Sequence, residues 1–218
     1  MTRELGLRER KKQRTRQLIA ETARRLFAER GFEAVRVSEV AKAADVSEAT
    51  VFNYFPTKED LFYSRLEAFE DELMTAIRER EPGQSVLAAF GAFLLARGGV
   101  LAMSSPGGDD EATERIRTVS RVITESPALL ARERQVFDRY AETLAAFLAE
   151  ETGAKPGDVS PRVVANAIIG LHRAIIEYVR EQAAAGTRAA RIRPGVRAEA
   201  ERAIALLERG LGDYGVRS

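Results

Sequence analysis

The sequence contains no cysteine, and its only histidine is His172. Without cysteine, disulfide bonds, thiolate metal sites and cysteine nucleophiles are excluded. A single histidine also excludes a metal site built from several histidines. No recognisable nucleophile motif or phosphate-binding loop is present, so we expect no metal, no cofactor and no enzymatic activity.

The sequence also lacks a long uninterrupted apolar segment. Its most apolar stretch, Val86–Met103, is broken by Arg97, Gly98 and Gly99 and is short for a membrane span. The N-terminus is charged from Arg3 onward and has no apolar core like that of a signal peptide. We therefore expect a buried or pocket-lining helix in this stretch, no membrane partner, and a cytoplasmic protein.

The formal net charge of +1 hides an uneven distribution of charge. Residues 1–30 hold ten lysines and arginines against four glutamates, a net charge of +6, which leaves −5 for the rest. A basic end on an acidic chain indicates a polyanionic partner for that end. A solvated basic tail would explain the charge equally well.

Glycine and proline divide the sequence into segments with helical spacing of apolar residues, and no segment alternates as a β-strand does. Ser126-Pro127 and Ser160-Pro161 each place a capping residue before a proline, which favours the start of a helix. The pattern predicts an all-α fold of nine to ten helices. The expected helices cover residues 16–30, 38–44, 48–55, 57 to about 80, 84 to about 98, 109–124, 127–151, 161–185 and 194–211.

Two of the short predicted helices, 38–44 and 48–55, are joined by the tight turn Asp45-Val46-Ser47. Ser47 is placed to cap the second of them. Two short helices with a tight turn, after a longer helix and a basic lead-in, form a helix-turn-helix arrangement. Its second helix can enter the major groove of DNA.

The segment AKAADVSEATVFNYFPTKEDL, preceded by TARRLFAERGFEAVRVSEVA, resembles the TetR family of regulators. The usual family pattern is roughly A-x-x-A-G-V-S-x-x-T-x-Y-x-Y-F-x-S-K-x-x-L, and the resemblance covers about residues 14–75. It implies an N-terminal three-helix head that binds DNA and a C-terminal helical bundle for ligand binding and dimerisation. We expect the helix-turn-helix domain at 1–58 and the second domain at 59–218.

The resemblance also implies roles for single residues. Lys58 and Tyr54 match residues that contact the DNA backbone, and the hydroxyl of Thr50 would reach a phosphate or a base. Asn53 would pair with adenine, and Glu48 would either accept from cytosine or act only as a helix N-terminal carboxylate. The expected DNA-binding residues are Arg14, Thr15, Arg36, Ser38, Ser47, Glu48, Ala49, Thr50, Phe52, Asn53, Tyr54 and Lys58.

Three residues depart from the family pattern. Phe52 replaces a tyrosine, so it has no hydroxyl for the DNA backbone, and its ring would touch a thymine methyl or pack. Asp45 replaces the turn glycine, and aspartate tolerates a left-handed backbone better than most residues. Arg36 replaces a capping threonine and would contact phosphate instead. Ahead of the head, Lys11 and Lys12 would either reach a minor groove or stay disordered.

The last two long helices of TetR regulators usually pair across a two-fold axis, and here these are 161–185 and 194–211. Their apolar faces are wider than one core needs, which fits a homodimer interface; burial within the monomer is the alternative. The expected interface residues are Val164, Ile168, Leu171, Ile175, Tyr178, Ile204, Leu207 and Leu211.

A ligand pocket is expected among the helices between residues 84 and 180. The stretch ITESPALLARERQVFDRYAETLAAFLAEETG loosely resembles the branch linked to acyl-CoA-like ligands and mycofactocin-type regulators. Simple core packing is the alternative for each residue, including His172. The candidate ligand-binding residues are Phe90, Phe93, Leu94, Arg97, Met103, Arg121, Phe137, Tyr140, Ile169, His172 and Arg173.

These features predict a transcriptional regulator that responds to a ligand. It would be a repressor that binds a near-palindromic, double-stranded operator as a homodimer, with recognition helices roughly 34–36 Å apart. A small, largely apolar effector would shift it away from the DNA-competent state. The alternative is an architectural DNA-binding protein without an effector, with a dry, filled core between residues 84 and 180.

Overall fold

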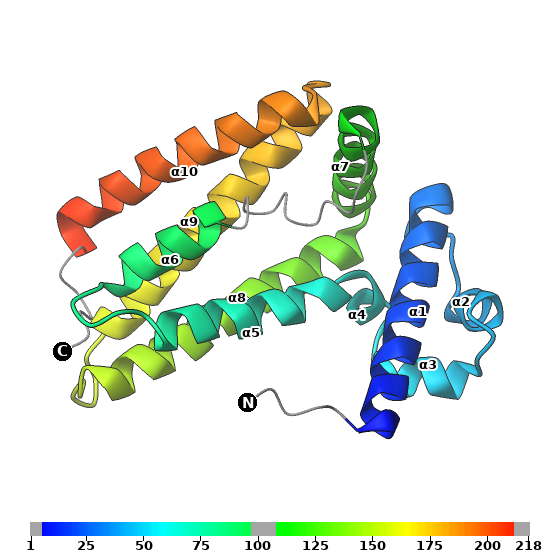
Figure 1. The fold of residues 1–218 in the computed structure, drawn as a ribbon, viewed down its shortest axis with the longest axis horizontal. Helices are drawn as coiled ribbons and strands as arrows, with labels where there is room; N and C mark the ends of the chain where they lie inside the picture. The colour runs from blue at the N-terminus through cyan, green and yellow to red at the C-terminus, as the bar shows by residue number, and fades with distance from the viewer. Residues whose placement is uncertain (1–5, 97–107, 212–218) are drawn as a thin grey trace. The chain divides into compact units, whose positions relative to one another are not determined.

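The computed structural model describes residues 6–96 and 108–211, apart from the side chains of residues 7, 65–68 and 211. These ranges form ten helices and no strand (Figure 1), which confirms the all-α prediction. None of the described helices has both the length and the apolar character needed to span a membrane. The helices are α1 (Leu7–Arg30), α2 (Val37–Ala43), α3 (Glu48–Tyr54), α4 (Lys58–Phe62), α5 (Ser64–Arg78), α6 (Val86–Ala96), α7 (Asp109–Thr124), α8 (Pro127–Glu151), α9 (Ser160–Ala184) and α10 (Ala189–Leu211).

The chain folds into two compact units. The first, called the head below, comprises residues 1–68 together with 122–130, and the second, called the body, comprises 69–121 and 131–218. The helices α5, α7 and α8 each continue from one unit into the other. A division at residue 58 according to function stays a prediction, because the compact units meet inside helices and not at a linker.

The first helix starts earlier than predicted, at Leu7 and not at Arg16. Residues 7–15 contain no glycine or proline and are rich in arginine, lysine, glutamine and glutamate, which are good helix formers. The predicted start was based on the spacing of apolar residues. A first turn that is polar and faces solvent has no such residues, so this spacing could not indicate it. Lys11 and Lys12 therefore lie exposed on a helix and do not form a disordered tail.

The predicted helix from 57 to about 80 is two helices, because Tyr63 interrupts it. Its backbone, at φ −87° and ψ 14°, leaves the helical region between α4 and α5. The Tyr63 side chain is buried, and its hydroxyl donates a hydrogen bond to the carbonyl oxygen of Leu129 at 3.1 Å. This contact joins the start of α5 to the start of α8 inside the head.

The last helix also starts earlier than predicted, at Ala189, and it runs through Pro194. Side chains of α7 stabilise its first turn. The N–H of Ala190 donates to the Asp109 carboxylate at 2.6 Å, and that of Ala189 to the Thr113 hydroxyl at 2.9 Å. These caps come from about eighty residues upstream, so no local pattern in the sequence could indicate them.

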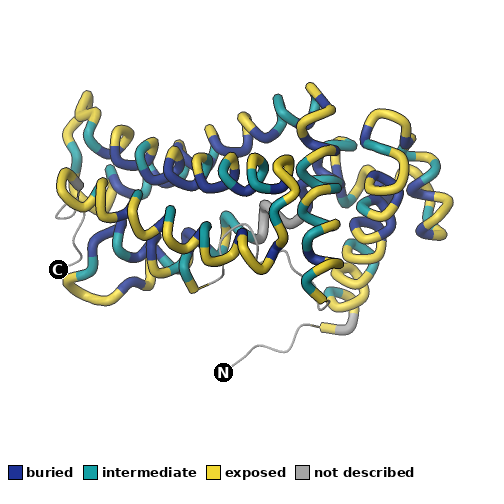
Figure 2. Tube along the Cα trace, turned by 90° about the horizontal axis from the view of Figure 1, so that it is seen from above, coloured by how far each residue is buried: buried dark blue, intermediate teal, exposed yellow. Residues whose placement is uncertain are grey.

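In the body, α10 packs against both α9 and α6 (Figure 1). Two glycines allow the close approach. A Cβ atom at Gly195 would collide with the hydroxyl of Tyr178, and one at Gly91 would lie 2.9 Å from the Cδ1 atom of Ile204. Figure 2 shows the result as buried stripes along the inner faces of the helices, with exposed residues on their outer faces.

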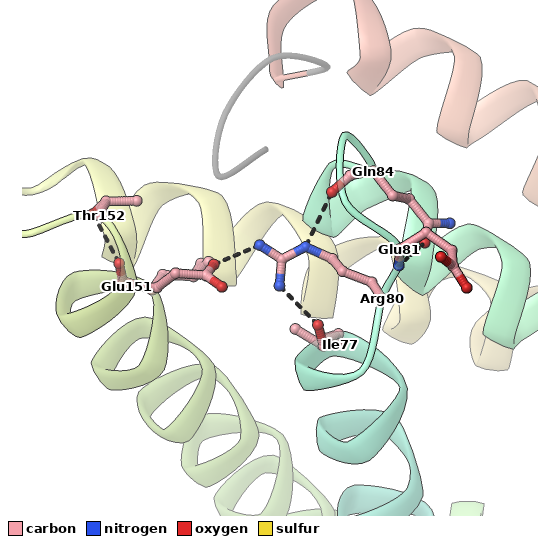
Figure 3. A network of polar contacts seen from close by, with 7 residues as sticks. Ile77, Arg80, Glu81, Gln84, Glu151 and Thr152 are labelled. Atoms are coloured by element: carbon pink, nitrogen blue, oxygen red, sulfur yellow. Dashed lines mark hydrogen bonds and ion pairs between the residues drawn. The ribbon is translucent and has the colours of Figure 1, made fainter. Parts of the chain in front are cut away.

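A fully buried arginine, Arg80, closes one end of the body (Figure 3). Its guanidinium donates to the carbonyl oxygens of Ile77 at 2.7 Å and Gln84 at 3.1 Å, and it pairs with the Glu151 carboxylate at 2.5 Å. The three acceptors belong to the end of α5, the turn before α6 and the end of α8. One planar side chain therefore ties three segments together.

Replacing Arg80 with alanine should lower the free energy of unfolding by roughly 3–5 kcal/mol, because Glu151 and two carbonyls lose a buried partner. Urea denaturation followed by circular dichroism measures the change. The matched control is Arg117→Ala, which removes an exposed pair with Glu114 on α7 and should cost less than about 1 kcal/mol. Equal losses for the two variants would contradict the structural role of Arg80.

Candidate functional site

The turn between α2 and α3 is held by one residue in a left-handed conformation. Asp45, at φ 54°, is the one non-glycine residue with positive φ among those described. After it, the N–H of Val46 donates to the carbonyl oxygen of Ala41 at 3.0 Å. The expectation that aspartate can replace the turn glycine is confirmed.

The second short helix, α3, is fixed by a cap and by one buried residue. The Ser47 hydroxyl accepts from the N–H of Thr50 at 3.1 Å, and the two hydroxyl oxygens lie 2.8 Å apart. Val51 is fully buried, which turns the opposite face outward. The side chains on that outer face are Glu48, Ala49, Phe52 and Asn53, and Phe52 is 45% exposed although it is apolar.

Arg36 begins α2 without a capping side chain, and Glu39 supplies the cap. The Glu39 carboxylate accepts from the Arg36 N–H at 2.8 Å and pairs with Arg30 at 2.7 Å. The hydrogen bonds from Arg30 and then from the Arg36 backbone lower the pKa of Glu39. Arg36 and Ser38 remain exposed at the helix start.

Lys58 lies at the first position of α4, behind a reciprocal cap between Thr57 and Asp60, each bond being 3.1 Å. Its ammonium group sits 4.2 Å from the centre of the Phe32 ring and 5.9 Å from that of Phe27. Burial against these rings lowers the pKa of Lys58. The aromatic rings orient this half-buried cation, and its contact with a phosphate stays a prediction.

An open groove of about 760 Å³ runs along α1 beside the end of α3. The charged residues of α1 that line it are Lys12, Arg16 and Arg24 together with Glu9 and Glu21, and Asn53 and Tyr54 of α3 also contribute. Sequence reasoning did not assign Lys12 to this surface. Lys12 lies four residues before Arg16, so the two fall on the same face of a helix. This spacing is informative only if the helix begins before Lys12.

The head also contains the turn between α7 and α8. The Ser126 hydroxyl donates to the Glu33 carboxylate at 2.6 Å and accepts from the N–H of Leu129 at 3.3 Å. The capping role of Ser126 follows from its place before Pro127. Its bond to Glu33, ninety-three residues away, could not be read from a local pattern.

Five of the candidate ligand-binding residues come together in the body. The His172 ring on α9 lies 6.4 Å from Phe90 on α6 and 5.8 Å from Phe137 on α8, measured between ring centres. Phe69, on α5, was not among the candidates. Its ring stacks on His172 at 4.6 Å and lies 5.3 Å from Phe93, the fourth candidate, and 6.4 Å from Tyr140, the fifth.

The other candidates lie around these rings or outside the described residues. Leu94 and Ile169 are buried, and Arg121 is exposed. The guanidinium of Arg173 lies 5.7 Å from the Phe137 ring centre. Arg97 and Met103 lie outside the described residues.

His172 is an unusual member of this group. It is 2% exposed, and its Nδ1 atom is buried with no hydrogen-bond partner among the described residues. Burial lowers its pKa to about 4. At neutral pH the ring is therefore uncharged.

Comparison with known proteins gives the family. Residues 19–64 match the family model described as bacterial regulatory proteins of the tetR family, and residues 95–211 match the one described as the MftR C-terminal domain. The chain belongs to the TetR family. It is therefore a DNA-binding transcriptional regulator, and its named relatives are regulators and not enzymes.

Two relatives match most of this TetR regulator. The mycofactocin biosynthesis transcriptional regulator MftR of Mycobacterium tuberculosis is 28% identical over 167 residues, which is 73% of this chain and 77% of the relative. TcmR of Streptomyces glaucescens is 29% identical over 161 residues, 73% of this chain and 70% of the relative.

Solved structures share the fold of this TetR regulator at low identity. GusR of Salmonella enterica has a TM-score of 0.55 at 19% identity, covering 91% of this chain and 95% of that one. NalD, the secondary repressor of the MexAB-OprM multidrug efflux pump in Pseudomonas aeruginosa, has a TM-score of 0.56 at 18% identity, covering 91% and 96%.

Most residues that were expected at a dimer interface of the regulator are buried within its own body. Ile204, for example, packs onto Gly91 of α6. Tyr178 and Leu207 are half-buried, and the side chain of Leu211 lies outside the described part. The five that are buried within the chain are Val164, Ile168, Leu171, Ile175 and Ile204.

The turn gives a prediction about Asp45. Replacement by glycine should leave the head as stable or more stable, because glycine adopts positive φ without steric cost. Replacement by alanine should cost about 1 kcal/mol, because a Cβ atom disfavours this backbone region and the short polar side chain is removed. Thermal unfolding of both variants tests this, and an alanine variant as stable as the wild type would contradict it.

His172 gives a prediction about pH. Its pKa is about 4 in the folded chain and about 6.5 when unfolded, so the unfolded chain binds the proton first. The stability contributed by neutral His172 is complete above about pH 6.5 and falls by about 3 kcal/mol as the pH drops towards 4.

Urea denaturation between pH 7.5 and 4.5 measures this loss. The control is His172→Phe, which keeps a ring in the same place but cannot be protonated. Acidic residues titrate alike in both proteins, so the difference between them isolates the histidine. A wild-type loss no larger than that of the control would count against the assignment.

Proposed function

We propose that the protein is a homodimeric repressor that binds a near-palindromic operator and is released by a small, largely apolar effector. The observation that carries this proposal is the outer face of α3, which presents exposed, chemically varied side chains beside the basic surface of α1. Such a helix can read base edges while cations on α1 contact phosphates. With DNA as its partner, the protein would act in the cytoplasm.

The protein would make two kinds of contact with DNA, one to the bases and one to the phosphates. Asn53 can form two hydrogen bonds with adenine, and the exposed ring of Phe52 can contact the methyl group of thymine. Arg14 and Arg36, both exposed, would contact phosphates and set the register. The ring-supported ammonium of Lys58 would act in the same way.

The outer faces of α9 and α10 support a dimer. Val163 and Leu206 are 57% and 62% exposed. Gly170 and Ala174 are exposed on the same face of α9 as Val163, and their small size would let a second helix approach closely. Two copies joined here about a two-fold axis would form a four-helix bundle.

The aromatic residues of the body support an apolar effector, since they could wall a pocket for one. The helices α5 and α8 run from these rings into the head, where Tyr63 and Leu129 join them. An effector that favours a different arrangement of these helices would shift the population away from the DNA-competent state. A coupling of about 1–3 kcal/mol would lower DNA affinity 5- to 150-fold.

The close packing of these rings also fits a second candidate, an architectural DNA-binding protein without an effector. It would bind DNA equally well with and without any ligand of the body. The similarity to MftR and TcmR, both named as transcriptional regulators, favours the first candidate.

The direct test is a mobility-shift titration of the pure protein on an operator selected from its own genome. The proposal expects tight binding to a duplex with two half-sites and much weaker binding to one half-site. Asn53→Ala should lower affinity for the operator by roughly 5- to 150-fold and leave binding to random DNA unchanged.

Arg14→Gln is the matched phosphate-binding variant. It should weaken binding to all sequences alike and reduce the salt slope by about 0.9 for each phosphate that the variant no longer neutralises. Equal affinity for one and two half-sites would contradict the dimer. An absence of sequence-specific binding at moderate salt would sink the proposal as a whole.

A further inference from the structure

Six rings from four helices of the body form one aromatic cluster. Four members, Phe90, Phe137, Tyr140 and His172, are almost fully buried. Phe69 and Phe93, 5.3 Å apart, are only half-buried. The cluster therefore has a closed inner side and an accessible side. Its members are Phe69 of α5, Phe90 and Phe93 of α6, Phe137 and Tyr140 of α8, and His172 of α9.

The Nδ1 atom of His172 lies inside this cluster and has no hydrogen-bond partner in the part of the chain that the structure describes. Buried nitrogen atoms in folded proteins nearly always have a partner, and one without any calls for an explanation. In neutral imidazole one nitrogen donates and the other accepts, and which is which depends on the tautomer. A hydroxyl group can both donate and accept, so it can pair with Nδ1 in either tautomer.

The surroundings disfavour a charged partner. The same burial that lowers the pKa of His172 to about 4 would raise the cost of bringing any charge to its ring. Of the charges near the cluster, Arg139 pairs with Glu70 at 3.1 Å and Arg180 pairs with Glu133, while the guanidinium of Arg173 lies against the Phe137 ring. A partner for Nδ1 is therefore neutral.

We propose that the aromatic cluster binds a neutral, planar aromatic molecule that carries a hydroxyl group. The molecule enters between Phe69 and Phe93 and displaces the Phe69 ring, and its hydroxyl group lies in the plane of the His172 ring, where it pairs with Nδ1. This inference rests on the proposed function in one respect, that the body binds an effector. It adds the chemical class of that effector and the atom that selects it.

Displacement of Phe69 would also give the ligand a route to the head. Phe69 is the first residue of the body on α5, and the same helix reaches back to Ser64 in the head. A ring that replaces Phe69 must move this side chain and the turn of α5 that bears it. Binding and release of DNA would then be coupled through one helix.

The probe is 2-naphthol, and naphthalene is the matched molecule without a hydroxyl group. The chain has no tryptophan, so the fluorescence anisotropy of either probe can be followed in the full-length protein with little background. The expected result is that 2-naphthol binds about tenfold more tightly than naphthalene, the usual effect of satisfying one buried polar group.

Two variants separate the partner atom from the ring. His172→Phe should bind both probes equally, because the ring remains and the nitrogen is gone. Tyr140→Phe removes the hydroxyl group of the cluster and should keep the preference for 2-naphthol. Equal binding of both probes to the wild type, no binding of either, or a preference that survives His172→Phe would overturn the inference.

A second measurement does not depend on the folding of a variant. His172 is the only histidine of the chain, so its ring nitrogen signals in a ¹⁵N NMR spectrum need no mutational assignment. The Nδ1 signal should shift strongly with 2-naphthol and little with naphthalene, and identical shifts would refute the pairing. Operator binding without any probe is measured separately, and its absence would contradict the proposed function while leaving the ligand site intact.

Discussion

The pairing of α5 with α8 is the contact on which most of this structure depends. In the head, the Tyr63 hydroxyl bonds to the Leu129 carbonyl oxygen. In the body, Glu70 holds Arg139 and Phe69 packs on Tyr140, and at the far end Arg80 binds Glu151. Two of these four contacts, those of Tyr63 and Arg80, satisfy a buried polar group, so sliding one helix along the other would leave both groups without a partner.

The local caps and turns of the head could be predicted from the sequence. Ser47 caps the helix that it was expected to cap, and Thr57 caps α4 in the same way, because a cap needs only residues three positions apart. The turn at Asp45 follows for the same reason. The cap of α2 by Glu39 was equally local and was missed, although Arg36-x-x-Glu39 carries the acidic half of a capping box.

Contacts between residues that are far apart in the sequence could not be predicted. The start of α10 depends on Asp109 and Thr113, and the turn before α8 depends on Glu33. The apolar width of α9 and α10 was visible, but a helical pattern does not say what covers it. Ile204 meets Gly91 of the same chain, and a stripe facing a second copy would look the same in the sequence.

For the body, aromatic spacing on α6, α8 and α9 was enough to name most of the cluster. Phe69 was not among the candidates because it lies on the helix predicted at 57 to about 80, ahead of the residues 84–180 where the pocket was expected. The isolation of the His172 nitrogen also escaped, since a pattern records which residues turn inward but not which atoms they meet. The ligand chemistry proposed above therefore rests on three-dimensional contacts and not on sequence spacing.

The early start of α1 changes the thermodynamics expected for DNA association. Its basic residues stand on a formed helix, where positions four apart are separated by about 6 Å along the axis. Arg8, Lys12 and Arg16 share this spacing, and Lys12 and Arg16 line the same groove. A basic tail that folds on binding would lose conformational entropy at that moment and give a large negative heat-capacity change. A preformed helix avoids that loss, so association here should be driven mainly by the release of counterions.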